Sequence, residues 1–129
     1  MRNYIHKNYF RMKNEETLIK KNGFGQLSFC KECNLFYLKF SSVLIELTRK
    51  EFRAFHLVVK DIDTNYWDRL HKYSHESRIY PISTSQQNLV LIFNKSELQA
   101  LKELVLITKN ERDSYVSLFD ISQKKFFLN

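Results

Sequence analysis

The chain contains the same short pattern twice, and this repeat limits its fold more than any other feature of the sequence. Residues 43–55, VLIELTRKEFRAF, align without gaps with residues 89–101, LVLIFNKSELQAL. Each copy reads as an apolar strand, a capping residue and the start of an amphipathic helix. A single strand–helix unit cannot bury its own apolar side, whereas two units can share one core. The repeat therefore predicts an α+β fold built from two repeated strand–helix units.

Both copies are expected to begin their helix with a capping box. Thr48 and Glu51 stand three residues apart in the first copy, as do Asn94 and Glu97 in the second. The cap side chain can accept a hydrogen bond from the third helical amide, while the glutamate reaches back to the cap amide. Apolar residues then recur on one face of each helix: Phe52, Phe55, Val58, Val59 and Ile62 in the first, and Leu98, Leu101, Leu104 and Val105 in the second. We expect these two faces to be buried.

Short connections predict antiparallel strands around the repeat. Strands are expected at residues 26–29, 35–40 and 43–47, joined by turns that permit only antiparallel neighbours. Two more are expected at residues 79–83 and 88–93. Pro81 places the former at a sheet edge, because proline cannot donate to a ladder. The prediction is one antiparallel sheet of about five strands, with both amphipathic helices on one face.

Charge divides the chain into two parts. A length of 129 residues is typical of one domain. The net charge is +7, and the first 21 residues hold six Lys or Arg against two Glu. We therefore expect a basic N-terminal arm over residues 1–22 and a single α+β domain over residues 23–129. A basic arm attracts polyanions, although a solvated tail is the simpler interpretation.

The arm contains residue types that suit nucleic acid. Basic side chains contact phosphates, and aromatic rings stack on bases. The candidates for binding nucleic acid are Arg2, Lys7, Tyr9, Phe10, Arg11 and Lys13. Nucleic acid is therefore one candidate partner of the chain.

Cys30 and Cys33 are the two cysteines of the chain. They are too close together to staple distant parts of a fold, but two thiolates in one turn can bind a Zn²⁺ ion. A closed zinc site needs two more ligands, and His71 and His75 stand at helical spacing. The separation of the two pairs is far longer than in zinc fingers. Zinc is the one cofactor that the sequence suggests; a redox dithiol and two reduced turn residues are the alternatives.

Catalytic motifs are missing from the sequence. It has no glycine-rich phosphate loop, no nucleophile elbow and no zincin helix. His56 aligns with Lys102 in the repeat, which indicates a histidine on a helix surface. No signal peptide and no apolar run of membrane-spanning length is visible. The chain is therefore expected to be a cytoplasmic, non-enzymatic protein without membrane contact.

Residues from Gly23 to about Leu104 resemble an uncharacterised family of short proteins from the Bacteroidota. The resemblance rests on short segments that read CKEC at 30–33, LKF at 38–40, LTxxEF at 47–52, DIDxxYW at 61–67, IYPI at 79–82 and NLxLxF at 88–93. The family has no assigned activity, so the resemblance implies an uncharacterised domain and carries over no functional residues.

The combined features favour an interaction or regulatory module, acting through self-association as a homodimer or through a protein partner. Leu57 and Leu106 lie off the expected core faces and are the candidate interface residues. Eleven Phe and seven Tyr are more than one small core needs. The alternatives are nucleic-acid binding through the basic arm, and a zinc or redox role for Cys30 and Cys33.

Overall fold

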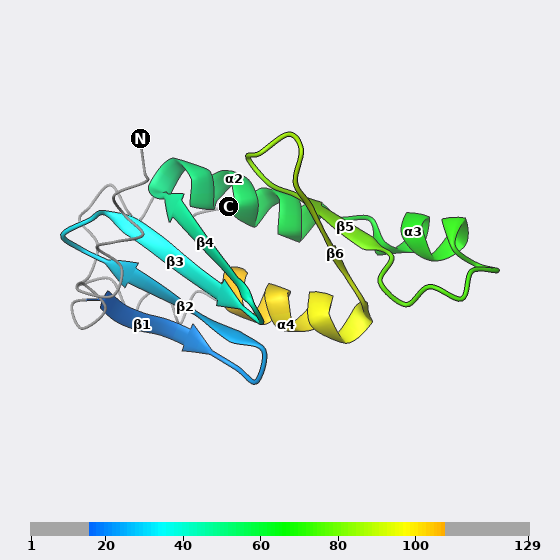
Figure 1. The fold of residues 1–129 in the computed structure, drawn as a ribbon, viewed down its shortest axis with the longest axis horizontal. Coiled ribbons are helices and arrows are strands. Elements are labelled where there is room, and N and C mark those ends of the chain that lie inside the picture. The colour runs from blue at the N-terminus through cyan, green and yellow to red at the C-terminus, as the bar shows by residue number, and fades with distance from the viewer. Residues whose placement is uncertain (1–15, 108–129) are drawn as a thin grey trace.

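The computed structural model describes residues 16–107, which form an α+β fold of six strands and three helices. The chain enters through four consecutive strands, continues through two helices, and ends with a β-hairpin and a last helix (Figure 1). The strands are β1 (Glu16–Lys21), β2 (Gly25–Cys30), β3 (Leu35–Phe40), β4 (Val43–Thr48), β5 (Tyr80–Ser83) and β6 (Val90–Phe93). The helices are α2 (Arg49–Asp61), α3 (Thr64–Leu70) and α4 (Lys95–Val105).

The strands form two antiparallel sheets rather than the single sheet of about five strands that we expected. The first has the order β1-β2-β3-β4, and the second contains β5 and β6. The segment containing α2 and α3 carries the chain away from β4 before β5 begins (Figure 1). β5 then packs against α2, and β6 packs against α4. The hairpin therefore forms a separate sheet beside the core.

β1 was not expected. Residues 16–21 were assigned to the basic arm, but they pair with β2 as the first strand of the larger sheet. The strand is hard to recognise because a single apolar pair, Leu18 and Ile19, stands among polar and basic residues. A β-bulge between Leu18 and Lys20 further disturbs its alternation. Residues 1–15 of the expected arm lie outside the described residues.

The turns between the first four strands do not use glycine in left-handed backbone. Neither Gly23 nor Gly25 has a positive φ. Positive φ occurs instead at Asn34 (58°) and Ser41 (54°). The turn between β1 and β2 is closed by Asn22, whose Oδ1 accepts the amides of Phe24 and Gly25 at 2.9 and 3.1 Å. A side chain that accepts two amides stabilises this turn without left-handed backbone.

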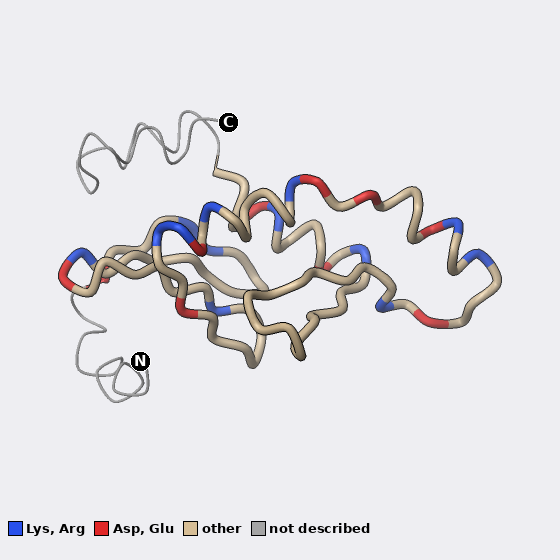
Figure 2. The backbone as a smooth tube through the Cα atoms, turned by 90° about the horizontal axis from the view of Figure 1, so that it is seen from above, with Lys and Arg blue, Asp and Glu red and all other residues tan. Residues whose placement is uncertain are grey.

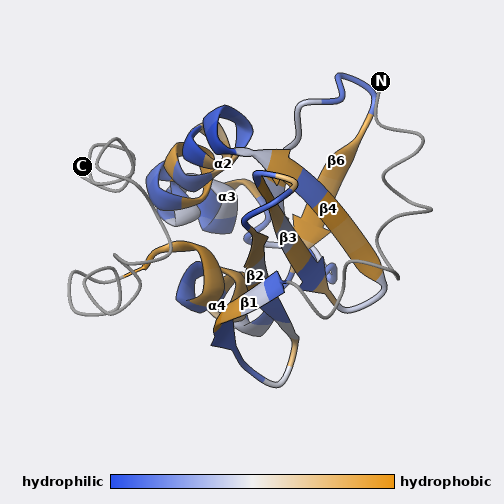
Figure 3. Ribbon diagram, turned by 90° about the vertical axis from the view of Figure 1, so that its left-hand side faces the viewer, coloured by the Kyte–Doolittle hydropathy of each residue, from blue (hydrophilic) through white to orange (hydrophobic). Residues whose placement is uncertain are grey.

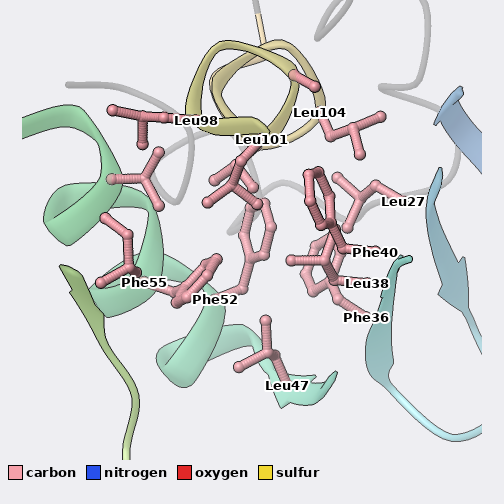
Figure 4. Packing of buried hydrophobic residues seen from close by; sticks show 14 of the residues in the cluster. Leu27, Phe36, Leu38, Phe40, Leu47, Phe52, Phe55, Leu98, Leu101 and Leu104 are labelled. Carbon is pink, nitrogen blue, oxygen red and sulfur yellow. The ribbon is translucent and has the colours of Figure 1, made fainter. Parts of the chain in front are cut away.

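The core lies between the four-stranded sheet and two helices. Side chains from β2 and β3 meet those of α2 and α4 on one face of the sheet (Figure 4). The ring of Phe52 stacks on Phe36 with 4.3 Å between centroids. The expected helix faces are confirmed with one exception: Val58 is 38% exposed, because it lies at the margin of the α2 face rather than over the sheet.

Helix α3 was missed by the sequence prediction. The sequence pattern predicts no helix between the two repeated units, whereas α3 occupies Thr64–Leu70. Asp63 caps it by accepting the Tyr66 amide at 3.1 Å. None of its residues is buried. A helix without a buried face leaves no apolar period in the sequence, which explains the miss.

Both capping boxes are present, as the sequence predicts. The Glu51 amide donates to Thr48 Oγ1 at 3.1 Å, and the Thr48 amide donates to Glu51 Oε1 at 2.9 Å. The corresponding distances between Asn94 and Glu97 are 2.8 and 2.9 Å. These bonds satisfy amides that have no partner inside either helix.

Replacing either cap by alanine is expected to destabilise the fold moderately. Thr48→Ala and Asn94→Ala should each lower the free energy of unfolding by about 1 kcal/mol, because one helix amide loses its acceptor. Urea unfolding of the full chain measures the change, and Lys50→Ala on the exposed side of α2 is the matched control. Cap variants as stable as this control would contradict the assignment.

Candidate functional site

The β5–β6 hairpin presents an apolar face to solvent. Tyr80 and Ile82 of β5 point into the core and are buried. On the opposite face, Val90 and Ile92 of β6 are 49% and 52% exposed. Figure 3 shows β6 as an apolar strand that is not covered by the helices. Exposed apolar side chains on one strand are typical of an interaction surface.

β6 also has an open backbone edge within residues 16–107. It pairs with β5 alone, and Pro81 lies opposite Ile92. Proline has no amide hydrogen, so this pair must occupy a position without mutual hydrogen bonds. The Phe93 carbonyl, one residue further, accepts the Ile79 amide at 3.1 Å on the β5 side. The backbone groups of Val90 and Ile92 therefore point toward the open edge, where a further strand could pair.

The outer edges of β1 and β5 carry features that oppose pairing. β1 carries Lys20, Lys21 and a bulge. Pro81 interrupts the outer edge of β5. β4 lies beside an apolar groove of about 180 Å³, which it shares with α2 and with the hairpin residues Ser83, Thr84 and Ser85. Lysines, bulges and prolines are the usual means of preventing edge pairing, and the sequence VLIF of β6 has none of them.

Two contacts fix the position of the hairpin. The Tyr80 hydroxyl donates to the Asp68 carboxylate of α3, and this bond raises the pKa of Tyr80 to about 12. Just before β5, Arg78 donates to both Glu97 oxygens at 3.0 and 2.8 Å. The guanidinium lowers the pKa of Glu97, which also completes the α4 capping box. Both contacts hold the hairpin at the start of β5.

The cysteines lie in the turn between β2 and β3. Cys30 ends β2 and is buried, whereas Cys33 is half-buried, and the two are not joined by a disulfide. The Cys33 amide donates to Cys30 Sγ at 3.2 Å. Burial is the main cause that raises the pKa of Cys30 to about 11, so this thiol is protonated at neutral pH. Burial and the nearby Cys33 also raise the pKa of Tyr37.

The structure does not bring the expected zinc ligands together. The β2–β3 turn lies at one end of the molecule, and α3, which ends next to His71, lies at the other (Figure 1). The His71 ring is in hydrogen-bond distance of the Trp67 carbonyl at 3.1 Å. Among residues 16–107, no three His, Cys, Asp or Glu side chains gather closely enough to hold a metal ion. A site made of Cys30, Cys33, His71 and His75 is therefore not assembled within one chain.

His56 lies half-buried on α2, beside the ring of Phe52 at a centroid distance of 6.5 Å. Burial lowers its pKa, and the positive charge of Lys60 adds to this effect. The two neighbours give the imidazole an apolar contact and a like charge. This environment favours a neutral helix-surface histidine, and it supplies no nucleophile for the ring to activate.

The predicted interface leucines differ from each other. Leu57 is 39% exposed on α2, so it is accessible to a partner. Leu106 is half-buried and packs against the core. It follows α4 as the C-cap residue, where the chain turns back toward the core. Leu106 is therefore less accessible than the helix pattern indicated.

The candidates for binding nucleic acid, Arg2, Lys7, Tyr9, Phe10, Arg11 and Lys13, lie outside the described residues. Within residues 16–107, basic side chains gather around one cavity. Lys20, Lys21 and Lys102 line a shallow cavity of about 590 Å³ together with Asn22 and one acidic residue, Glu103. Asn22 Nδ2 donates to the Ala100 carbonyl at 3.0 Å and so joins the β1–β2 turn to α4. Elsewhere, basic and acidic residues are interspersed along the described chain (Figure 2).

No helix within residues 16–107 has both the length and the apolar composition needed to cross a membrane. The expectation of a cytoplasmic protein stays a prediction.

The comparison with known families identifies the family to which the chain belongs. A model described as a family of unknown function, DUF6686, matches residues 12–129. The chain belongs to the DUF6686 family. This confirms the expected resemblance to an uncharacterised domain and extends it to nearly the whole sequence. Neither a curated protein nor a solved structure matches this DUF6686 chain.

Proposed function

We propose that this chain is a small non-enzymatic interaction module that forms a homodimer through the open edge of β6. The observation that carries the proposal is the coincidence of exposed apolar side chains and outward backbone groups at Val90 and Ile92. Either feature alone is common on protein surfaces. Together they provide both the hydrogen bonds and the apolar contacts that an added strand needs.

A second copy of the chain suits this edge well. β6 carries no charge, so two copies can pair as antiparallel strands without repulsion. A two-fold axis through such a pair would place the Val90 and Ile92 side chains of one copy beside those of the other. Each cross-strand pair contributes roughly 0.2–1 kcal/mol. Four residues in each strand therefore give a modest affinity, and the dimer should depend on protein concentration.

We further infer that residues 43–55 and 89–101 are two equivalent strand–helix units. Their capping boxes have the same form, and Phe52 and Leu98 are buried at corresponding positions. β4 pairs with β3 alone at the edge of the four-stranded sheet, and β6 pairs with β5 alone. Dimerisation would give β6, whose sheet has two strands, a second neighbour.

Ile92→Lys tests the proposed dimer. Sedimentation of the full chain at increasing concentration should show a monomer–dimer equilibrium, and the variant should weaken it about tenfold or more, because each copy would place a charge within an apolar strand pair. Leu70→Lys, at an exposed leucine of α3, is the matched control and should leave the equilibrium unchanged. A wild-type chain that stays monomeric, or an Ile92→Lys variant that dimerises normally, would reject the proposal.

Nucleic-acid binding is the second candidate function, and the lysine-lined cavity next to the arm favours it. If Lys20 and Lys21 contact phosphates, Lys20→Gln with Lys21→Gln should weaken binding to single-stranded RNA. The slope of log affinity against log salt should fall by about 1.4, because each contact contributes about 0.7. Lys72→Gln, an exposed lysine after α3, is the control. Binding that does not change with salt would exclude this function.

A further inference from the structure

The β2–β3 turn has the backbone geometry of half a metal site. Cys30 and Cys33 are separated by two residues, and the Cys33 amide points at the Cys30 sulfur. The bond from the Cys33 amide measures 3.2 Å. Amide donors directed at a sulfur atom stabilise the charge that a metal-bound thiolate carries.

The residue after the second cysteine completes this geometry. Asn34 has a φ of 58°, in the left-handed region that asparagine tolerates better than most residues. The chain therefore reverses directly after Cys33, and β3 leads away antiparallel to β2. The reversal keeps both thiols at the same end of the hairpin.

One copy of the chain cannot complete a zinc site around this turn from the described residues. A structural Zn²⁺ ion takes four ligands in a tetrahedron. Residues 16–107 hold no group of three ligand side chains, and His71 lies next to α3 at the opposite end of the molecule (Figure 1). Because the whole sequence has two cysteines, a further thiolate pair must come from another molecule.

We propose that one Zn²⁺ ion is shared between two copies of the chain, each of which contributes Cys30 and Cys33. A two-fold axis through the ion would generate a closed site of four thiolates. Cys33 is half-buried and Cys30 is fully buried, so the ion would meet Cys33 first and the Cys30 thiol would turn outward to complete the pair. Lys31 and Glu32 are both exposed at the tip, and the same axis can place Lys31 of one copy near Glu32 of the other. This contact is separate from the β6 edge.

The test uses the full-length chain with Ile92→Lys, so that association through β6 does not contribute. Reduced, metal-free protein is titrated with Zn²⁺, and its mass and metal content are measured. We expect about 0.5 zinc per chain, a doubled mass, and return to monomer with a chelator. Cys33→Ser should abolish both effects, whereas His71→Ser with His75→Ser should change neither.

Three outcomes would overturn the shared site. The first is binding of one zinc per monomer without a change in mass, which would show that a single chain completes the site. The second is less than a tenth of a zinc per chain in reducing conditions. The third is zinc-dependent dimerisation that Cys33→Ser retains.

If Cys33→Ser fails to fold by circular dichroism, the stoichiometry and mass of the parent protein still decide between the outcomes. Failure here leaves the β6 dimer untouched, since that dimer is measured without added metal.

Discussion

Phe52→Ala is expected to lower the free energy of unfolding by about 3–5 kcal/mol. The Phe52 side chain is fully buried at the start of α2 and stacks on Phe36 of β3. Removal of the ring loses its transfer free energy and leaves a cavity between the helix and the sheet. Leu98 has the corresponding position at the start of α4, and Leu98→Ala should cost about 2–5 kcal/mol.

Urea unfolding of the full chain measures both losses. Arg53→Ala is the matched control, because Arg53 is the exposed neighbour of Phe52 on the same helix. Its effect should stay within about 0.5 kcal/mol. If Leu98→Ala were as mild as the control while Phe52→Ala was severe, the two strand–helix units would not share one core, and the inferred equivalence would be wrong.

Gly25→Ala is expected to destabilise the fold by about 3 kcal/mol or more, although it adds a single methyl group. A Cβ atom at Gly25 would lie 1.9 Å from the backbone carbonyl oxygen of Lys39 in the adjacent strand β3. The backbone atoms of Lys39 cannot move aside as the end of a flexible side chain can. The substitution therefore forces β2 and β3 apart where Gly25 pairs with Phe40.

Gly23 provides the control for this prediction within the same turn. A Cβ atom at Gly23 would meet no heavy atom within 4 Å, and its φ is not positive. Gly23→Ala should therefore be neutral or stabilising by about 0.4–1 kcal/mol, through the unfolded state. Thermal unfolding compares the two variants directly. Equal stability of both would mean that the β2–β3 pairing at Gly25 is not as close as described.

The parts of the fold that could be predicted are those with strong local chemistry. The capping residues Thr48 and Asn94 and the buried stripes that follow them are found where the sequence pattern places them. These features depend on side chains within one or two turns of helix, so the sequence alone determines them.

The missed features depend on tertiary context. β1 is a short edge strand with lysines, and α3 is an exposed helix without an apolar face. The separation of β5 and β6 from the main sheet depends on how α2 and α4 pack, which no local pattern reveals. Val58 was misplaced for the same reason, because the width of the buried face of α2 is set by its neighbours.

The candidate site was predicted less well than the fold. Leu57 and Leu106 are the interface residues that the sequence predicts, because they lie off the helix stripes, whereas it predicts no site on residues 88–93. Pro81 was the sequence signal that could have led to this site, because proline indicates an edge strand. Pro81 lies in β5, so its antiparallel neighbour β6 is the strand to examine for an unpaired backbone edge. The exposure of Val90 and Ile92 then follows from alternation along β6.

Hydrogen exchange of the β6 amides at low and high protein concentration tests the proposed dimer most directly. Val90 and Ile92 direct their amides to the open edge, whereas those of Leu91 and Phe93 face β5. Pairing of two β6 strands predicts that exchange at Val90 and Ile92 slows as the dimer forms, while exchange at Leu91 and Phe93 changes much less. Unchanged exchange at Val90 and Ile92, while the molecular mass doubles without added metal, would show that the chain dimerises through another surface.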